Sequence, residues 1–68
     1  LQERALGILF DIASVNKEDG LKLLYKTNGS VKLSLLIALS GLDIIDAKQM
    51  LIRSRGNLRK ALSNVSIN

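Results

Sequence analysis

The sequence predicts a small all-α domain. Its 68 residues contain no proline, and apolar residues recur at helical spacing through most of the chain. Apolar residues make up 47% of the composition and aromatic residues only 3%, so the expected core is aliphatic, as in packed helices. A chain this short buries only about 60% of the surface that its unfolded form exposes. We therefore expect one domain over residues 1–68, a bundle of about five short helices with an efficient core.

The first helix is expected over residues 2–13 and carries more apolar surface than one neighbouring helix would cover. One stripe follows a single helical face and should meet the rest of the bundle: Leu1, Ala5, Ile8, Leu9 and Ile12. A second stripe lies beside it: Leu6, Phe10 and Ala13. Two faces of this helix should therefore be covered by other surfaces.

A glycine turn joins the second and third helices. Asn16 has a suitable side chain to cap a helix over residues 17–27. Gly29 is expected to end this helix, because glycine adopts the left-handed conformation without penalty. Ser30 can then cap a third helix over residues 31–40, which is apolar almost all round and should lie at the centre of the domain.

The pattern restarts after Gly41, which should end the third helix. Matching residue types lie 27 positions apart: Asn16 and Asp43, Asp19 and Asp46, Leu24 and Leu51, Lys26 and Arg53, Gly29 and Gly56, Ser30 and Asn57. A fourth helix is expected after Asp43, and a short fifth helix has one apolar face: Leu58, Ala61, Leu62 and Val65. Each half is thus helix, turn, helix, and Gly29, Gly41 and Gly56 are predicted to be structural turns.

The formal net charge of +4 is compatible with nucleic-acid binding, but the placement of the cations favours a solvated surface. Lys26, Arg53 and Arg55 fall at the expected ends of helices, where a cation is stabilising by roughly 0.3–1 kcal/mol. Lys22 and Lys48 fall on expected outer faces. None of these residues requires an anionic ligand to explain it.

A helix-turn-helix DNA-binding module would need an exposed recognition helix with polar residues near its start. The third helix is too apolar, and the fifth offers only Asn57, Arg59 and Lys60. Phe10 and Tyr25 are the only aromatic residues, which gives no platform for stacking bases. Nucleic-acid binding is therefore not expected, and a free-standing interaction or DNA-binding module remains the alternative function.

Catalysis by this chain alone is not expected. Without histidine or cysteine there is no Ser-His-acid triad, no thiolate nucleophile and no usual ligand set for a transition metal. Most of the acidic residues crowd the starts of helices, where solvent would not hold a pair of carboxylates for acid-base work. We predict no catalytic residue, no metal and no cofactor.

The sequence indicates neither a membrane span nor a signal peptide. The longest apolar stretch, LSLLIALSGL, is shorter than the roughly 20 residues of a span and is broken by Ser40 and Gly41. The opening LQER places charge where a signal peptide would begin its hydrophobic region. The absence of cysteine favours a reducing, cytoplasmic setting.

The stretch that ends in GNLRKAL resembles the last helix of small ubiquitin-associated domains. Members of that family bind partners through a Met-Gly-Phe or Met-Gly-Tyr loop between their first two helices. The corresponding loop here is LSGLDI, around Gly41, and lacks that signature. The resemblance implies a ubiquitin-associated-like fold and not ubiquitin recognition.

Three phrases in order resemble the C-terminal helical domain of bacterial N-acetylmuramic acid 6-phosphate etherases: LQERALGIL, NGSVKLSLLIALSGLDIIDAKQML and RGNLRKAL. Together they cover nearly the whole chain. The animal glucokinase regulatory protein has a related architecture, with a helical lid over sugar-isomerase-type domains. The resemblance implies a cytoplasmic lyase of peptidoglycan recycling whose α/β sugar-phosphate domain, absent here, carries the catalytic residues. The chain itself would then be a lid or a support for a homodimer.

The resemblance also implies roles for particular residues. Family members begin this segment with an N-x-K-L-x-x-R phrase that approaches the sugar-phosphate pocket, and only Leu1 and Arg4 of that phrase stand here. Arg4 would therefore lie near the ligand in the full-length parent. The stripe of Leu6, Phe10 and Ala13 would meet the α/β domain or a second subunit, and the isolated chain should self-associate through it.

Overall fold

The computed structural model describes residues 2–66, and the side chains of residues 3–63. Within that range all regular structure is helical, which confirms the predicted all-α class and the five helices. They are α1 (Gln2–Ala13), α2 (Lys17–Lys26), α3 (Val31–Ser40), α4 (Ile44–Arg53) and α5 (Leu58–Ser66). Leu1 and the side chain of Val65, both assigned to apolar faces above, lie outside the described residues.

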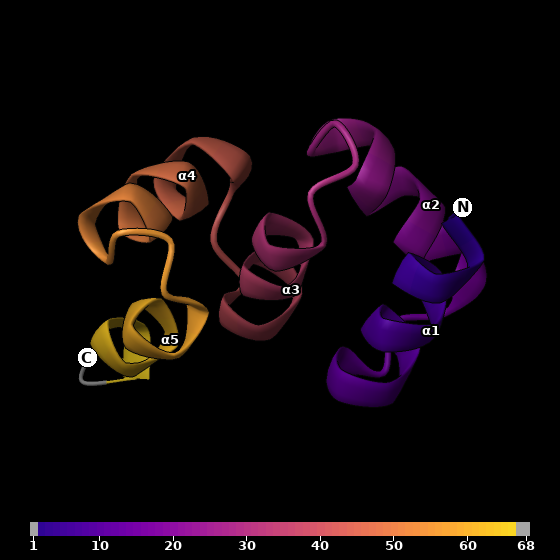
Figure 1. The fold of residues 1–68 in the computed structure, drawn as a ribbon, viewed down its shortest axis with the longest axis horizontal. Helices are drawn as coiled ribbons and strands as arrows, with labels where there is room; N and C mark the ends of the chain where they lie inside the picture. The colour runs from indigo at the N-terminus through magenta and orange to yellow at the C-terminus, as the bar shows by residue number, and fades with distance from the viewer. Residues whose placement is uncertain (1, 67–68) are drawn as a thin grey trace.

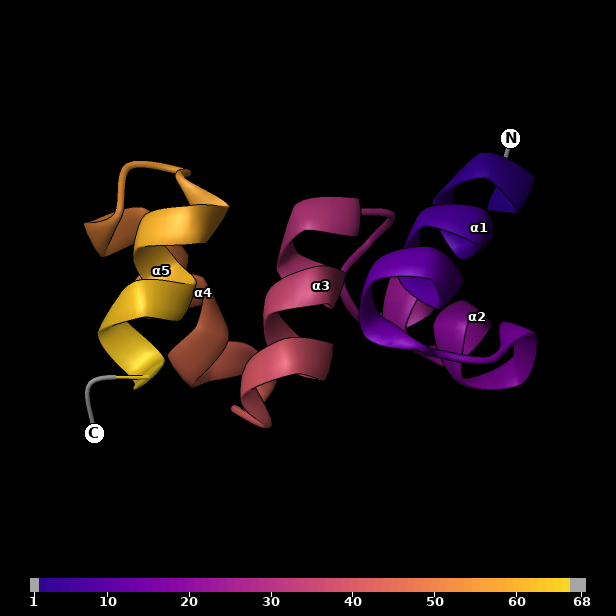
Figure 2. The ribbon, with the colours of Figure 1, turned by 90° about the horizontal axis from the view of Figure 1, so that it is seen from below.

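The central position predicted for the third helix is confirmed. In Figure 1, α3 lies in the middle, with α1 and α2 on one side and α4 and α5 on the other. It contacts all four of these helices, and α1 also contacts α2 as α4 contacts α5. Turned by 90°, Figure 2 shows that α1, α3 and α5 all begin at the same edge of the molecule. The wide apolar surface of α3 is therefore needed for contacts in several directions, although Leu39 stays 43% exposed.

Two clusters of buried side chains fill the spaces on either side of α3. The N-terminal cluster contains Leu9, Leu24 and Leu35. The C-terminal cluster contains Leu33, Leu36, Ala47 and Ala61. Partly buried side chains surround each cluster, and Leu58 packs against both.

The predicted caps begin four of the helices. Asn16 Oδ1 accepts a hydrogen bond from Asp19 N at 2.8 Å, and Asp43 Oδ1 accepts one from Asp46 N, also at 2.8 Å. Ser30 Oγ accepts from Leu33 N at 3.2 Å. Asn57 Oδ1 accepts from Lys60 N at 3.0 Å. Each cap satisfies an amide that the first turn of its helix leaves without a partner.

The glycine turns adopt the predicted left-handed backbone, with φ of 86° at Gly29, 78° at Gly41 and 76° at Gly56. Gly29 is not, however, the first left-handed residue of the turn that ends α2. Asn28, with φ of 57°, is already left-handed, and Arg55 has φ of 56° before Gly56.

Hydrogen bonds explain this placement. Gly29 N donates to Leu24 O at 2.7 Å, and Asn28 N donates to Tyr25 O at 3.3 Å, which is the Schellman pattern. The same pair of bonds recurs 27 residues later, where Gly56 N donates to Leu51 O at 2.9 Å. Asparagine therefore takes the first left-handed position beyond the cap, where glycine is commonest, and glycine follows it.

The 27-residue repeat holds in space and extends further than the sequence indicated. The shift relates α1–α2–α3 to α3–α4–α5, so that α3 belongs to both units. Several matched positions share their burial: Leu9 and Leu36 are fully buried, as are Ser34 and Ala61, while Thr27 and Ser54 are each 6% exposed. Ser14, with φ of 56°, takes the place of Gly41.

The division of α1 into two stripes differs from the prediction. Ile12, expected to face the bundle, is 58% exposed. Leu6 and Ala13, expected on the outer stripe, pack against the N-terminal cluster. The cause is the direction from which α2 approaches: a Cβ on Gly20 would lie 2.7 Å from Leu6 Cδ2 and 3.6 Å from a Cδ1 atom of Leu9. The α1–α2 contact therefore runs along Leu6 and Leu9.

Candidate functional site

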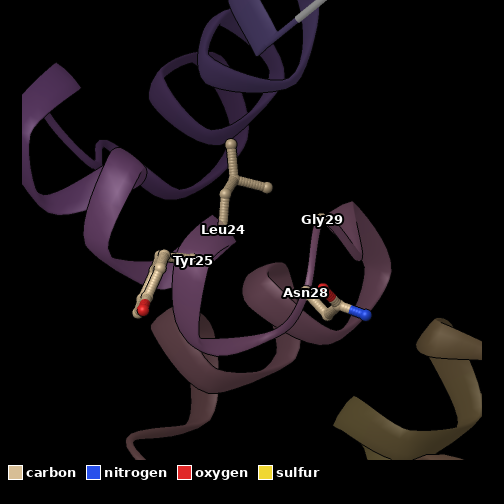
Figure 3. A pocket seen from close by; sticks show the side chains of 4 residues that line it. All are labelled: Leu24, Tyr25, Asn28 and Gly29. Carbon is tan, nitrogen blue, oxygen red and sulfur yellow. The ribbon is translucent and has the colours of Figure 1, made fainter.

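The larger surface depression, of about 560 Å³, lies at the end of α2 and does not have the form of a binding site. It is lined by Leu24, Tyr25, Asn28 and Gly29. Figure 3 shows that the side chain of Leu24 points toward α1, whereas those of Tyr25 and Asn28 point away from it and from each other. Tyr25 is 91% exposed. Because these side chains do not converge, the depression offers no set of groups that could hold a ligand.

A second depression, of about 310 Å³, lies along α1. Its walls are formed by Glu3, Leu6, Gly7 and Phe10 of α1 and by Lys17 at the start of α2. We call it the α1 groove. Leu6, Gly7 and Phe10 make most of its lining apolar, and the two charged residues are exposed.

The three residues predicted for the interface have different environments. Phe10 is 62% exposed, with its side chain on the α1 groove. Leu6 lines the groove but is half-buried, and Ala13 is half-buried against the N-terminal cluster. Of these three residues, Phe10 therefore offers the most apolar surface. The α1 groove also includes Glu3, Gly7 and Lys17, which the sequence analysis did not assign to an interface. A signal was present: Gly7 stands inside a helix where no turn requires glycine.

Arg4 lies exposed in the first turn of α1. It lines neither of the two depressions described above. A role beside a ligand would therefore depend on surfaces supplied from outside this chain.

The basic residues lie at the surface, as predicted. Lys26 and Arg53 occupy the last turns of α2 and α4. At the start of α5, Arg59 and Lys60 are exposed, while the amide of Asn57 is engaged as the helix cap. With Oδ1 engaged, Asn57 cannot form the bidentate contact that asparagine makes with adenine, which leaves Arg59 and Lys60 of the three residues that a recognition helix would have used.

The buried polar side chains of residues 3–63 all carry hydroxyls. Among described side chains, the buried polar residues are Thr27, Ser34 and Ser54. Every described acidic and basic side chain is exposed. In the same range, no group of three or more acidic residues is arranged to hold a metal ion, and no helix is long and apolar enough to cross a membrane. The described surface therefore contains no enclosed acid-base pair.

Fold and surface together define a class: a small all-helical domain built from two overlapping three-helix units, with an apolar groove on its first helix. The particular homologues are N-acetylmuramic acid 6-phosphate etherases, which confirms the resemblance inferred from the sequence. The etherase of Prochlorococcus marinus strain NATL1A is 71% identical over 62 residues, which cover 91% of this chain and 20% of the relative. The etherase of Prochlorococcus marinus strain MIT 9303 is 44% identical over 64 residues, which cover 94% of this chain and 20% of the relative. The etherase of Synechocystis sp. is 42% identical over 62 residues, which cover 91% of this chain and 20% of the relative.

The chain spans about a fifth of the length of these relatives. No family model matches the sequence, and no solved structure matches it.

Proposed function

We propose that the chain serves as a non-catalytic helical domain of an N-acetylmuramic acid 6-phosphate etherase. The observation that carries this proposal is the 71% identity over 91% of the chain to an etherase five times as long as the aligned region. The exposed positions of the chain's acidic side chains are in keeping with chemistry located elsewhere in a longer protein. That protein would cleave the D-lactyl ether to give N-acetylglucosamine 6-phosphate and D-lactate, in the cytoplasm, during peptidoglycan recycling.

Within that protein, the domain would act as a lid over an α/β sugar-phosphate domain or as a support for a homodimer. The support for this role is the exposed apolar surface around Phe10, which an isolated domain gains nothing from presenting to water. The ubiquitin-associated-like character of α3–α4–α5 stays a prediction and adds no partner of its own.

The first experiment compares the longer etherase with the same protein shortened by removal of this domain, with D-lactate release as the measurement. If the domain acts as a lid or dimer support, its removal should lower the rate of D-lactate release or the dimer content. The remaining α/β domain should stay folded. Full activity and unchanged dimer content after removal would contradict the proposed role.

The proposed position of Arg4 near the sugar phosphate has its own test. A guanidinium suits bidentate contact with phosphate, and a lost charge-assisted hydrogen bond costs roughly tenfold or more in binding. Arg4→Ala in the longer protein should therefore raise KM for the sugar phosphate by about that factor. Arg55→Ala, which removes another exposed arginine, is the matched control. Equal kinetics for wild type and Arg4→Ala would remove Arg4 from the ligand site.

A specific nucleic-acid function is not favoured, because Asn57 Oδ1 is engaged as a helix cap. In addition, Lys26 and Arg53 lie in the last turns of α2 and α4, where a cation is stabilising without a ligand. Titration of the chain with duplex DNA at low and moderate salt tests this alternative. Tight binding that depends on Arg59 and Lys60 would revive it.

A further inference from the structure

Three exposed cations stand at helix starts, where the charge of the helix does not favour them. Lys32 lies in the first turn of α3, and Arg59 and Lys60 lie in the first turn of α5. The N-terminus of a helix carries a partial positive charge, so a cation there is repelled and an anion is stabilised. Neither helix has an acidic residue in its first turn. The dipole that accounts for Lys26 and Arg53 therefore does not account for these three residues.

The helices that begin at the other edge of the molecule show the opposite pattern. α2 and α4 start where α1 and α3 end, away from the edge at which α3 and α5 begin. Glu18 and Asp19 outnumber Lys17 in the first turn of α2, and Asp46 lies in the first turn of α4. These acidic side chains are placed as the helix dipole favours. The domain is thus polarised, with cations at the starts of α3 and α5 and acids at the starts of α2 and α4.

The cations of α3 and α5 belong to one surface. The two helices are in contact and begin at the same edge (Figure 2). Lys32 extends to the turn that precedes α5, since a Cβ on Gly56 would lie 4.0 Å from Lys32 Nζ. Every charged residue after Asp46 is a cation, so no acidic side chain from the last part of the chain offsets this charge. We call the surface formed by Lys32, Arg59 and Lys60 the basic edge.

The residue proposed to lie near the sugar phosphate stands at the same edge. Arg4 is in the first turn of α1, which begins beside α3, and Glu3 offsets its charge there. N-acetylmuramic acid 6-phosphate carries a carboxylate and a phosphate group of about −1.5 to −2 charge at pH 7. Surfaces of the opposite sign around a site raise the rate at which a charged substrate arrives, by about 10–10³-fold. The cations of α3 and α5 have the sign that this substrate requires.

We propose that the basic edge steers the anionic sugar phosphate toward its site in the longer protein. This inference rests on the proposed function, and in particular on the position proposed for Arg4. The cations act through their field before the substrate is bound. The Debye length is about 30 Å at 0.01 M salt and about 8 Å at 0.15 M, and the domain measures 30 Å along its longest axis. The whole edge therefore acts at low salt, and only its nearest charges act at physiological salt.

The test is the kinetics of D-lactate release by the longer protein between about 10 mM and about 300 mM salt. The kcat/KM of wild type should fall about tenfold over this range, while kcat changes by less than about twofold. Lys32→Glu/Arg59→Glu should lower kcat/KM about tenfold at the lowest salt and less than about twofold at the highest, because screening removes the field of the altered charges. Its kcat should equal that of wild type.

A matched control separates the basic edge from net charge. Lys22→Glu/Lys48→Glu reverses as many exposed cations in the middle of α2 and α4, and should lower kcat/KM by less than about threefold at the lowest salt. A second measurement separates steering from folding. Because an acid is favoured at a helix start, Lys32→Glu/Arg59→Glu should resist urea at least as well as wild type. Slower capture with undiminished stability is a result that a structural role for these residues would not give.

A kcat/KM of wild type that does not depend on salt would overturn the proposal. So would equal losses in the edge variant and the control, or a loss that persists at the highest salt, since that would indicate direct contact or a changed fold. If the edge variant abolishes binding of the chain to duplex DNA and leaves kcat/KM unchanged, the basic edge serves a nucleic acid instead. A longer protein that releases no D-lactate would contradict the proposed reaction itself, whereas an active enzyme without this salt dependence contradicts the steering alone.

Discussion

Thr27 and Ser54 occupy matched positions of the repeat, but their hydroxyls have different surroundings. Thr27 Oγ1 donates to Ser30 O at 3.1 Å and lies 2.8 Å from Ser34 Oγ. Because a hydroxyl has one proton, Ser34 is the donor in that pair whenever Thr27 donates to Ser30. The residue that matches Ser34 in the second unit is Ala61, and Ser54 Oγ is buried with no hydrogen-bond partner in the described structure. Ala61 thus removes one of the two partners that the matched hydroxyl has in the first unit.

Substitutions at these two positions should change stability in opposite directions. Ser54→Ala removes a buried hydroxyl that gains no hydrogen bond, and should raise the free energy of unfolding by about 1 kcal/mol. Thr27→Val keeps the shape but leaves Ser34 without its partner, and should lower it by about 1–3 kcal/mol. Urea denaturation of both variants measures the difference. A loss of stability in Ser54→Ala would show that its hydroxyl has a partner in solution.

Gly7 gives a second prediction for a single residue. Gly7→Ala should raise the free energy of unfolding by about 0.5–1 kcal/mol, because alanine favours the helix and its Cβ enters open space. Gly41→Ala is the contrast: with φ of 78°, it forces a left-handed alanine and should cost roughly 1–2 kcal/mol. Destabilisation by Gly7→Ala would mean that the fold itself requires glycine at this position.

At the scale of the helices, the sequence predicted most of what depends on short-range chemistry. The starts of α2, α3, α4 and α5 follow from cap residues whose side chains reach amides only three positions away. Which stripe of α1 becomes buried was predicted incorrectly, because Leu6 and Ile12 belong to equally apolar faces. The direction from which α2 arrives decides between them, and helical periodicity holds no information on that direction. The α1 groove was missed for the same reason, since Lys17 joins it from another helix.

The cap of α4 permits a quantitative test of this local chemistry. Asp43→Ala removes the acceptor for Asp46 N and should cost about 1 kcal/mol of unfolding free energy. Asp43→Asn should cost much less, because asparagine caps about as well and already does so at the matched Asn16. Thermal or urea unfolding gives the stabilities, and faster exchange of the Asp46 amide in the alanine variant locates the effect. Equal losses in both variants would assign the role to the charge of Asp43 instead of its hydrogen bond.

At the scale of the whole molecule, α3 joins the two halves physically. It supplies Leu35 to the N-terminal cluster and Leu33 and Leu36 to the C-terminal cluster, while Leu58 of α5 packs against both. Neither three-helix unit can therefore lose its core without disturbing a helix that the other unit needs. The chain should unfold as one cooperative unit although it has two separate clusters.

Leu36→Ala tests this coupling. Leu36 is fully buried in the C-terminal cluster, and truncation of a buried leucine costs about 2–5 kcal/mol. A chain of this size has a total stability of roughly 3–10 kcal/mol, so the loss is a large share of the whole. Amide hydrogen exchange should then accelerate in α1 and α2 as strongly as in α4 and α5, because the global opening of a two-state domain exposes all of them. Ile52→Ala, at a position 74% exposed, should change stability by less than about 0.5 kcal/mol and serves as the control. If exchange in α1 and α2 stays slow in Leu36→Ala while α4 and α5 lose protection, the two units unfold separately and α3 does not couple them.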